Sequence, residues 1–77
     1  MKEFIEFIAK HLVDSPDDVS VDVQEKDDQS VELSLQVSSD DVGKVIGKQG
    51  KTAQAMRTLL TAISAKDGKR AILKILD

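Results

Sequence analysis

The chain has 77 residues and a formal net charge of −3, with 32% charged and 40% hydrophobic residues. This length allows one domain, and this balance is typical of a folded domain rather than a disordered segment. The absence of cysteine and the presence of one histidine exclude a disulfide framework and a zinc site of cysteines and histidines. No apolar run approaches the roughly 20 residues of a membrane helix, and the start does not read as a signal peptide. We therefore expect no membrane association and a cytoplasmic location.

Charge is divided unevenly along the chain. Residues 1–42 hold 3 Lys or Arg and 12 Asp or Glu, a net charge of −9. Residues 43–77 hold 8 Lys or Arg and 2 Asp or Glu, a net charge of +6. Such asymmetry predicts a basic face set against an acidic remainder. The alternative that these charges only keep the surface hydrated stays open.

The first element expected is a helix over residues 2–13. Its apolar residues recur with the helical period and form one stripe. The stripe consists of Phe4, Ile5, Ile8 and Leu12. The polar segment 14–18 predicts a turn, because Pro16 prevents the helix from continuing.

Two strands are expected next. Every second residue is apolar over 19–23 and again over 31–37, which is the period of half-buried strands. The polar residues 25–29 between them suit a hairpin loop. The outward-facing residues of these strands are acidic or neutral, so this face is a poor platform for nucleic acid.

The second half predicts two helices and a last strand. Two serines followed by two aspartates at 38–41 are typical of a helix start. This short helix ends near Gly47, and a second helix covers about 50–65. Residues 71–76 are mostly apolar and predict a strand buried on both faces beside a parallel neighbour.

The expected order is therefore helix, strand, strand, helix, helix, strand. The two consecutive helices are long enough to cross over between parallel strands, and such crossovers are right-handed. We expect an α+β fold, in which three helices pack on one side of a three-stranded mixed sheet.

The most distinctive segment is Val45-Ile46-Gly47-Lys48-Gln49-Gly50, which joins the two helices. A P-loop needs a glycine five residues before Gly50, and a dinucleotide-binding turn needs one two residues before Gly47. Both positions are Val45. Both motifs also follow a strand directly, whereas a helix is expected here. Binding of nucleoside triphosphates or dinucleotides is therefore excluded.

The glycine turn has the properties of a site for a nucleic-acid backbone. Glycines allow a sharp turn and leave no Cβ in the way of a ligand, and the following helix start attracts anions. Lys48 and Lys51 can neutralise phosphates, and Lys44 and Arg57 extend the basic cluster. The glycine pair alone also fits a purely structural turn between helices, and this alternative stays open.

This segment resembles the core motif of KH domains, in which an apolar pair precedes Gly-x-x-Gly. The resemblance covers essentially the whole chain, so residues 1–77 are expected to form a single KH domain. The element order is that of the prokaryotic, type II arrangement. The short chain is similar to the small bacterial single-KH-domain RNA-binding proteins of the KhpA family.

The resemblance implies that the glycine turn clamps about four nucleotides of single-stranded RNA. An aliphatic groove would lie beside the clamp, with Ala53 near its floor, a variable loop at 66–70 opposite, and Ile72 on the far wall. The residues implied to contact RNA are Val42, Lys44, Val45, Ile46, Gly47, Lys48, Gln49, Gly50, Lys51, Arg57, Lys69 and Arg70.

The resemblance also implies a role and partners. The expected role is that of an RNA chaperone or post-transcriptional regulator, with no cofactor and no metal. Single-stranded DNA is an open alternative to RNA. Members of the family are associated with self-association and with a partner protein that contains a second KH domain, so a homodimer and a heteromeric complex are both expected.

No set of residues predicts catalysis, so the chain is not expected to be an enzyme. His11 is interpreted as a surface residue, and the acidic residues of the 14–18 turn as turn residues rather than metal ligands. The alternative function is a protein-interaction module. Its surface would be Leu59, at the edge of an apolar helix face, or the small-residue strip of Ala55, Thr58 and Ala62.

Overall fold

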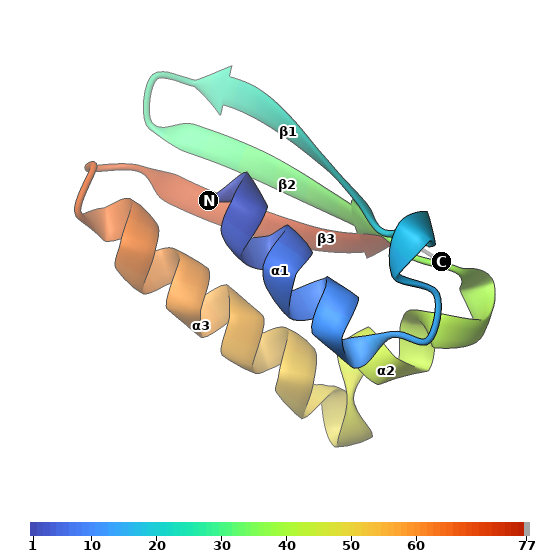
Figure 1. The fold of residues 1–77 in the computed structure, drawn as a ribbon. Coiled ribbons are helices and arrows are strands. Elements are labelled where there is room, and N and C mark those ends of the chain that lie inside the picture. The colour runs from blue at the N-terminus through green and yellow to red at the C-terminus, as the bar shows by residue number, and fades with distance from the viewer. Residues whose placement is uncertain (77) are drawn as a thin grey trace.

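The structure is a computed structural model that describes residues 1–76. Three helices lie on one face of a three-stranded sheet (Figure 1). The elements are α1 (Lys2–Leu12), β1 (Ser20–Asp27), β2 (Ser30–Gln36), α2 (Val42–Ile46), α3 (Lys51–Ala65) and β3 (Arg70–Leu76). Short 3₁₀ turns lie at Pro16–Asp18, Ser39–Asp41 and Lys48–Gly50. The predicted α+β fold and its element order are confirmed.

The sheet is mixed, with β2 at its centre. β1 pairs with β2 in antiparallel orientation, and β3 pairs with β2 in parallel orientation. Because β2 and β3 are parallel, the chain must cross from one end of the sheet to the other between them. The segment with α2 and α3 makes this crossover, as expected from the sequence.

The core lies between the sheet and the helices. Alternation along β2 directs Val31, Leu33 and Leu35 toward the helices, where all three are buried. Ile5 and Leu60 meet them from α1 and α3 and have no exposed surface. Full burial of such a side chain contributes about 1.5–3 kcal/mol, so β2 anchors the domain.

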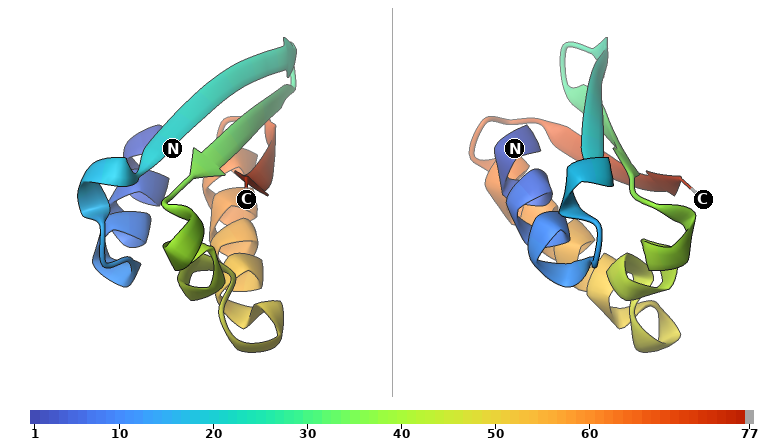
Figure 2. Two further views of the ribbon diagram at one scale, coloured as in Figure 1. Left: turned by 90° about the vertical axis from the view of Figure 1, so that its right-hand side faces the viewer. Right: turned by 45° about the vertical axis from the view of Figure 1, so that its right-hand side comes forward.

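The β1–β2 hairpin is longer than the sequence indicates. The predicted loop 25–29 is wrong, because β1 continues to Asp27 and pairs there with Ser30. The turn is closed by Asp27, whose Oδ1 accepts a hydrogen bond of 2.7 Å from the Gln29 N–H. The tip of the hairpin extends beyond the helices (Figure 2). Backbone pairing therefore sets the strand ends, and no apolar alternation marks them.

The last strand is an edge strand with one covered face. Its parallel neighbour is confirmed, but the prediction of burial on both faces is wrong: within β3 only Leu73 is buried. Ile72 and Leu76 lie on the open face of the sheet and are 39% and 41% exposed. The helices cover the other face only, and an apolar run in the sequence does not reveal on which side the cover lies.

The apolar stripe of α1 is rotated slightly from the predicted one. Ile5 and Ala9 are fully buried, whereas Leu12 is partly exposed at the end of the helix. Phe7 is 64% exposed, and its ring lies 4.4 Å from that of His11. His11 is on the surface, as predicted.

Candidate nucleic-acid interface

The turn between α2 and α3 lies at the end of the molecule opposite the tip of the β1–β2 hairpin (Figure 2). Three of its residues have positive φ: Gly47 (+77°), Gln49 (+58°) and Gly50 (+74°). The Gly47 N–H donates to the Gly43 carbonyl at 2.9 Å, and the Gly50 N–H donates to the Gly47 carbonyl at 3.1 Å. These positive φ values allow the chain to turn between α2 and α3 within four positions.

The two glycines of the turn are needed for different reasons. A Cβ at Gly47 would lie 2.6 Å from the Cβ of Thr52 and 2.9 Å from its backbone nitrogen, so the turn rests directly on the first turn of α3. No heavy atom lies within 4 Å of a Cβ built at Gly50, where only the positive φ favours glycine. Both the lack of room for a Cβ and the positive φ therefore require glycine at position 47.

Two cations at this turn, Lys48 and Lys51, have no carboxylate partner in residues 1–76, and Arg57 lies about 9 Å further along α3. Lys48, Lys51 and Arg57 are exposed, and none of them forms an ion pair with another residue in 1–76. Lys51 is the first residue of α3, a helix of 15 residues whose amino-terminal end carries a partial positive charge. Backbone dipole and side-chain charge therefore both favour an anion at this end.

The apolar wall beside the turn is smaller than the sequence predicts. Val45 has no exposed surface and Ala53 only 3%, so both belong to the core and cannot touch a base in this structure. The accessible part is Ile46, which is 38% exposed, together with half-buried Val42. Ile72 lies on the open face of the sheet and is not brought to this site.

Comparison with known proteins identifies the family. The family described as "KhpA/KhpB, KH domain" matches residues 2–75. The chain belongs to this KH-domain family. The resemblance predicted from the glycine turn and the element order is therefore confirmed.

Curated relatives of this KH domain carry the name "RNA-binding protein KhpA". One from Borreliella burgdorferi is 51% identical over 97% of this chain and 90% of its own length. Others, from Clostridium perfringens and Aquifex aeolicus, are each 47% identical, over 99% and 100% of this chain and 100% and 96% of their own. No solved structure matches. The family is non-enzymatic, which agrees with the prediction that the chain is not an enzyme.

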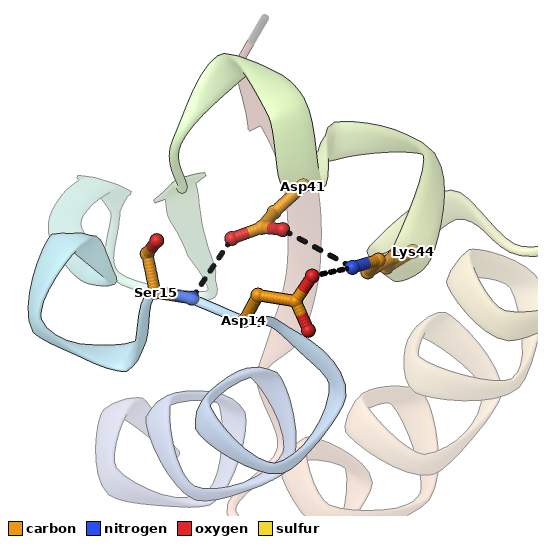
Figure 3. A network of polar contacts seen from close by, with 4 residues as sticks. All are labelled: Asp14, Ser15, Asp41 and Lys44. Carbon is orange, nitrogen blue, oxygen red and sulfur yellow. Dashed lines mark hydrogen bonds and ion pairs between the residues drawn. The ribbon is translucent and has the colours of Figure 1, made fainter.

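In this KH domain, Lys44 has carboxylate partners that sequence reasoning missed (Figure 3). Its Nζ forms an ion pair with Asp14 and lies 3.6 Å from Oδ1 of Asp41. The other oxygen of Asp41, Oδ2, accepts a hydrogen bond of 3.1 Å from the Ser15 N–H. The hydrogen bond to Asp14 raises the pKa of Lys44 above its usual 10.5. Lys44 is therefore not a free cation of the interface.

The serine side chains expected to cap α2 form no capping hydrogen bond at its start or at the 3₁₀ turn before it. Residues 39–41 form a 3₁₀ turn that starts from Ser38, and the backbone N–H of Asp41 donates to the Ser38 carbonyl at 2.8 Å. The buried polar side chain at this turn is that of Asp41, which contacts Ser15 and Lys44. The expected helix start is thus displaced to Val42.

Lys69 and Arg70 lie at the other end of the KH domain. The 15 residues of α3 separate them from the glycine turn, a distance of about 22 Å along the helix. Lys69 Nζ is 4.0 Å from Glu25 of β1, and the Arg70 N–H donates to the Gln29 carbonyl at 2.6 Å. The structure therefore places the predicted variable-loop residues beside the β1–β2 hairpin rather than beside the glycine turn.

The candidate contact surface for another protein chain is exposed on α3. Leu59 is 47% exposed, and Ala55, Thr58 and Ala62 are exposed as well. The Thr58 hydroxyl donates to the Gln54 carbonyl within the helix, so it has a partner already. Of the four, Leu59 is the residue whose burial against another chain would remove substantial apolar surface from water.

Neither a membrane span nor a metal cluster is found among residues 1–76. No helix there is long and apolar enough to cross a bilayer. No group of three or more His, Asp or Glu side chains there could hold a metal ion. Within the acidic turn that precedes β1, Asp14 pairs with Lys44 instead.

Proposed function

We propose that this KH domain binds single-stranded RNA, with the turn Gly47–Gly50 as a clamp on the nucleic-acid backbone. One observation carries the proposal. The turn lies too close to α3 for any Cβ at Gly47, and it leads directly into this long helix. Lys48 in the turn and Lys51 at the start of the helix form no ion pair within residues 1–76. The names of the relatives, which identify them as RNA-binding proteins, support the same assignment.

The clamp acts through the backbone of the nucleic acid. Lys48 and Lys51 neutralise phosphates, and the amino-terminal end of α3 adds its partial charge. Bases lie against Ile46 and Val42, a small aliphatic surface with no aromatic ring and little capacity to distinguish bases. Modest affinity with low base preference suits an RNA chaperone or a post-transcriptional regulator.

The salt dependence of binding tests this clamp. With about three phosphates neutralised, the slope of log K against log[salt] for a short labelled RNA single strand is expected to be about −2. Lys48→Gln removes one contact and makes the slope less steep by about 0.7. Fluorescence anisotropy between about 50 and 200 mM salt measures both values.

Lys66→Gln is the matched control for that experiment. Lys66 is exposed at the far end of α3 and forms no ion pair within the described chain, so its loss should leave the slope unchanged. Duplex RNA and single-stranded DNA of the same sequence test the choice of nucleic acid. Equal slopes for wild type and Lys48→Gln, with binding intact, would contradict the clamp.

Self-association is a second candidate function, favoured by the exposed Leu59 on α3. We expect a homodimer whose mass in analytical ultracentrifugation falls to that of the monomer in Leu59→Asp, with unchanged circular dichroism. Leu76→Asp, which changes a leucine of similar exposure on the open sheet face, should leave the dimer intact. A wild-type chain that stays monomeric at every accessible concentration would contradict this proposal.

A further inference from the structure

Asp41 is unusual among the charged residues that the structure describes. It is 2% exposed, and no other charged side chain in residues 1–76 is buried. A carboxylate removed from water is tolerated only when hydrogen bonds and opposite charge replace the lost hydration. Both replacements are present, from the Ser15 N–H and the Lys44 ammonium, and no buried side-chain polar atom in this part of the chain lacks a partner.

These contacts join segments that are distant in sequence. Asp14 and Ser15 follow α1, Asp41 precedes α2, and Lys44 lies within α2 (Figure 3). The ion pair between Lys44 and Asp14 spans 30 residues, and the hydrogen bond from Ser15 to Asp41 spans 26. Together they fasten α2 to the turn after α1.

Helix α2 needs such external support. It has five residues, and a helix this short does not hold its shape alone. Val45 is its one fully buried residue, and the next residue after the helix is Gly47, where the clamp begins. The apolar contact of Val45 fixes how deeply α2 sits, and the polar contacts on the same helix oppose its rotation.

We infer that Asp14, Asp41, Lys44 and the Ser15 amide form a positioning network for the clamp. In this network Lys44 holds α2 in place rather than contacting a phosphate. This inference rests on the proposed RNA clamp and assigns Lys44 a role that differs from that of Lys48. The two lysines are four residues apart and both are exposed, yet Lys44 has two carboxylate partners and Lys48 has none in the described residues. The raised pKa of Lys44 agrees with this pairing.

Hydrogen exchange in the free protein tests the positioning role without RNA. The Gly47 amide, which donates to Gly43, reports directly on the end of α2. Lys44→Met and Asp41→Asn should each make this amide exchange about tenfold faster, because local opening becomes easier. Lys44→Arg should restore the protection, and Lys48→Gln should leave it as in wild type. Unchanged exchange in Lys44→Met would overturn the positioning role.

RNA titration at several salt concentrations tests the second half of the inference. Because the apparent dissociation constant rises as the fraction of molecules with a competent clamp falls, Lys44→Met should bind RNA more weakly than wild type. The salt slope should stay that of wild type, whereas Lys48→Gln makes it less steep by about 0.7. A less steep slope in Lys44→Met would overturn the inference by making Lys44 a phosphate contact.

The positioning role of Lys44 and the RNA clamp can be tested separately. If Lys44→Met fails to fold, Asp14→Asn removes one of the two carboxylate partners and should produce a smaller change in exchange in the same direction; no change would count against the network. If wild-type protein binds no RNA, the proposed clamp fails, while faster exchange at Gly47 still supports the network as a positioning device for α2.

Discussion

Gly47→Ala is expected to lose about 2–6 kcal/mol of folding free energy and to weaken RNA binding, because it distorts the turn between α2 and α3. Gly47 has φ +77° and ψ 172°, a region that is nearly exclusive to glycine and costs about 1–3 kcal/mol for other residues. The new Cβ also overlaps Thr52, and such overpacking costs about 1–3 kcal/mol more. A domain of this length has about 4–11 kcal/mol in total, so the loss is a large share.

The other glycines of this region provide graded controls. Gly50→Ala meets no atom within 4 Å but keeps a positive φ, so we expect a loss of about 1–2 kcal/mol. Gly43→Ala lies in α2, also meets no atom within 4 Å, and should be neutral or stabilising by up to about 1 kcal/mol.

Urea denaturation followed by circular dichroism ranks the three variants, and RNA titration of the folded fraction follows. Shortening the side chain of Thr52 should not rescue Gly47→Ala, because the Thr52 backbone nitrogen is itself 2.9 Å from the new Cβ. If Gly47→Ala were no less stable than Gly50→Ala, the close contact between the turn and α3 would be refuted.

The fold was predictable because its signals are local. The period of two in β2 and the glycine turn between α2 and α3 each depend on residues close together in sequence. The length of the hairpin was not predictable. Glu25 and Asp27 pair with β2 through their backbones, and their polar side chains show no apolar alternation. The exposure of Ile72 was hidden for a related reason: sequence shows that β3 is apolar, but not which face the helices cover.

The geometry of the candidate site follows from the sequence at the glycine turn but not around it. The glycines are recognisable from their spacing, and the crowding of Gly47 against Thr52 explains why one of them is irreplaceable. The pairing of Lys44 with Asp14 could not be found, because Asp14 is 30 residues away and reaches Lys44 only in the folded chain. Asp41 is three residues before Lys44, a spacing that favours ion pairs on a helix and could have been recognised.

The uneven charge of the two halves acquires a different meaning in the folded chain. Three lysines of the basic half pair with acids of the acidic half: Lys44 with Asp14 and Asp41, Lys69 with Glu25, and Lys74 with Glu32. The asymmetry therefore does not produce one uniform basic face. It leaves cations without carboxylate partners near the glycine turn, and part of the remaining basic charge is balanced within residues 1–76.

Reversing the charge of the clamp is expected to have the largest effect on RNA binding. Lys48→Asp with Gln49→Asp changes the local charge by three units. One unit acting on a phosphate about 4 Å away amounts to about 1 kcal/mol at the dielectric constant of water, so three units amount to about 3 kcal/mol. The affinity for single-stranded RNA should therefore fall about a hundredfold.

The fold should survive this double substitution. Both side chains are exposed, and Gln49 has φ 58° and ψ 26°, a left-handed conformation in which aspartate is more readily accommodated than most residues. Circular dichroism and anisotropy measured on the same samples separate lost binding from lost structure.

The matched control is Lys66→Asp with Ala65→Asp. Both residues are exposed, and the double substitution makes the same charge change at the far end of α3. The far end of α3 is about 22 Å from the glycine turn, and charges this far apart are screened at physiological salt, so this control should lose little RNA affinity. An equal loss of affinity in the two double variants would mean that total charge, rather than the clamp between α2 and α3, governs binding.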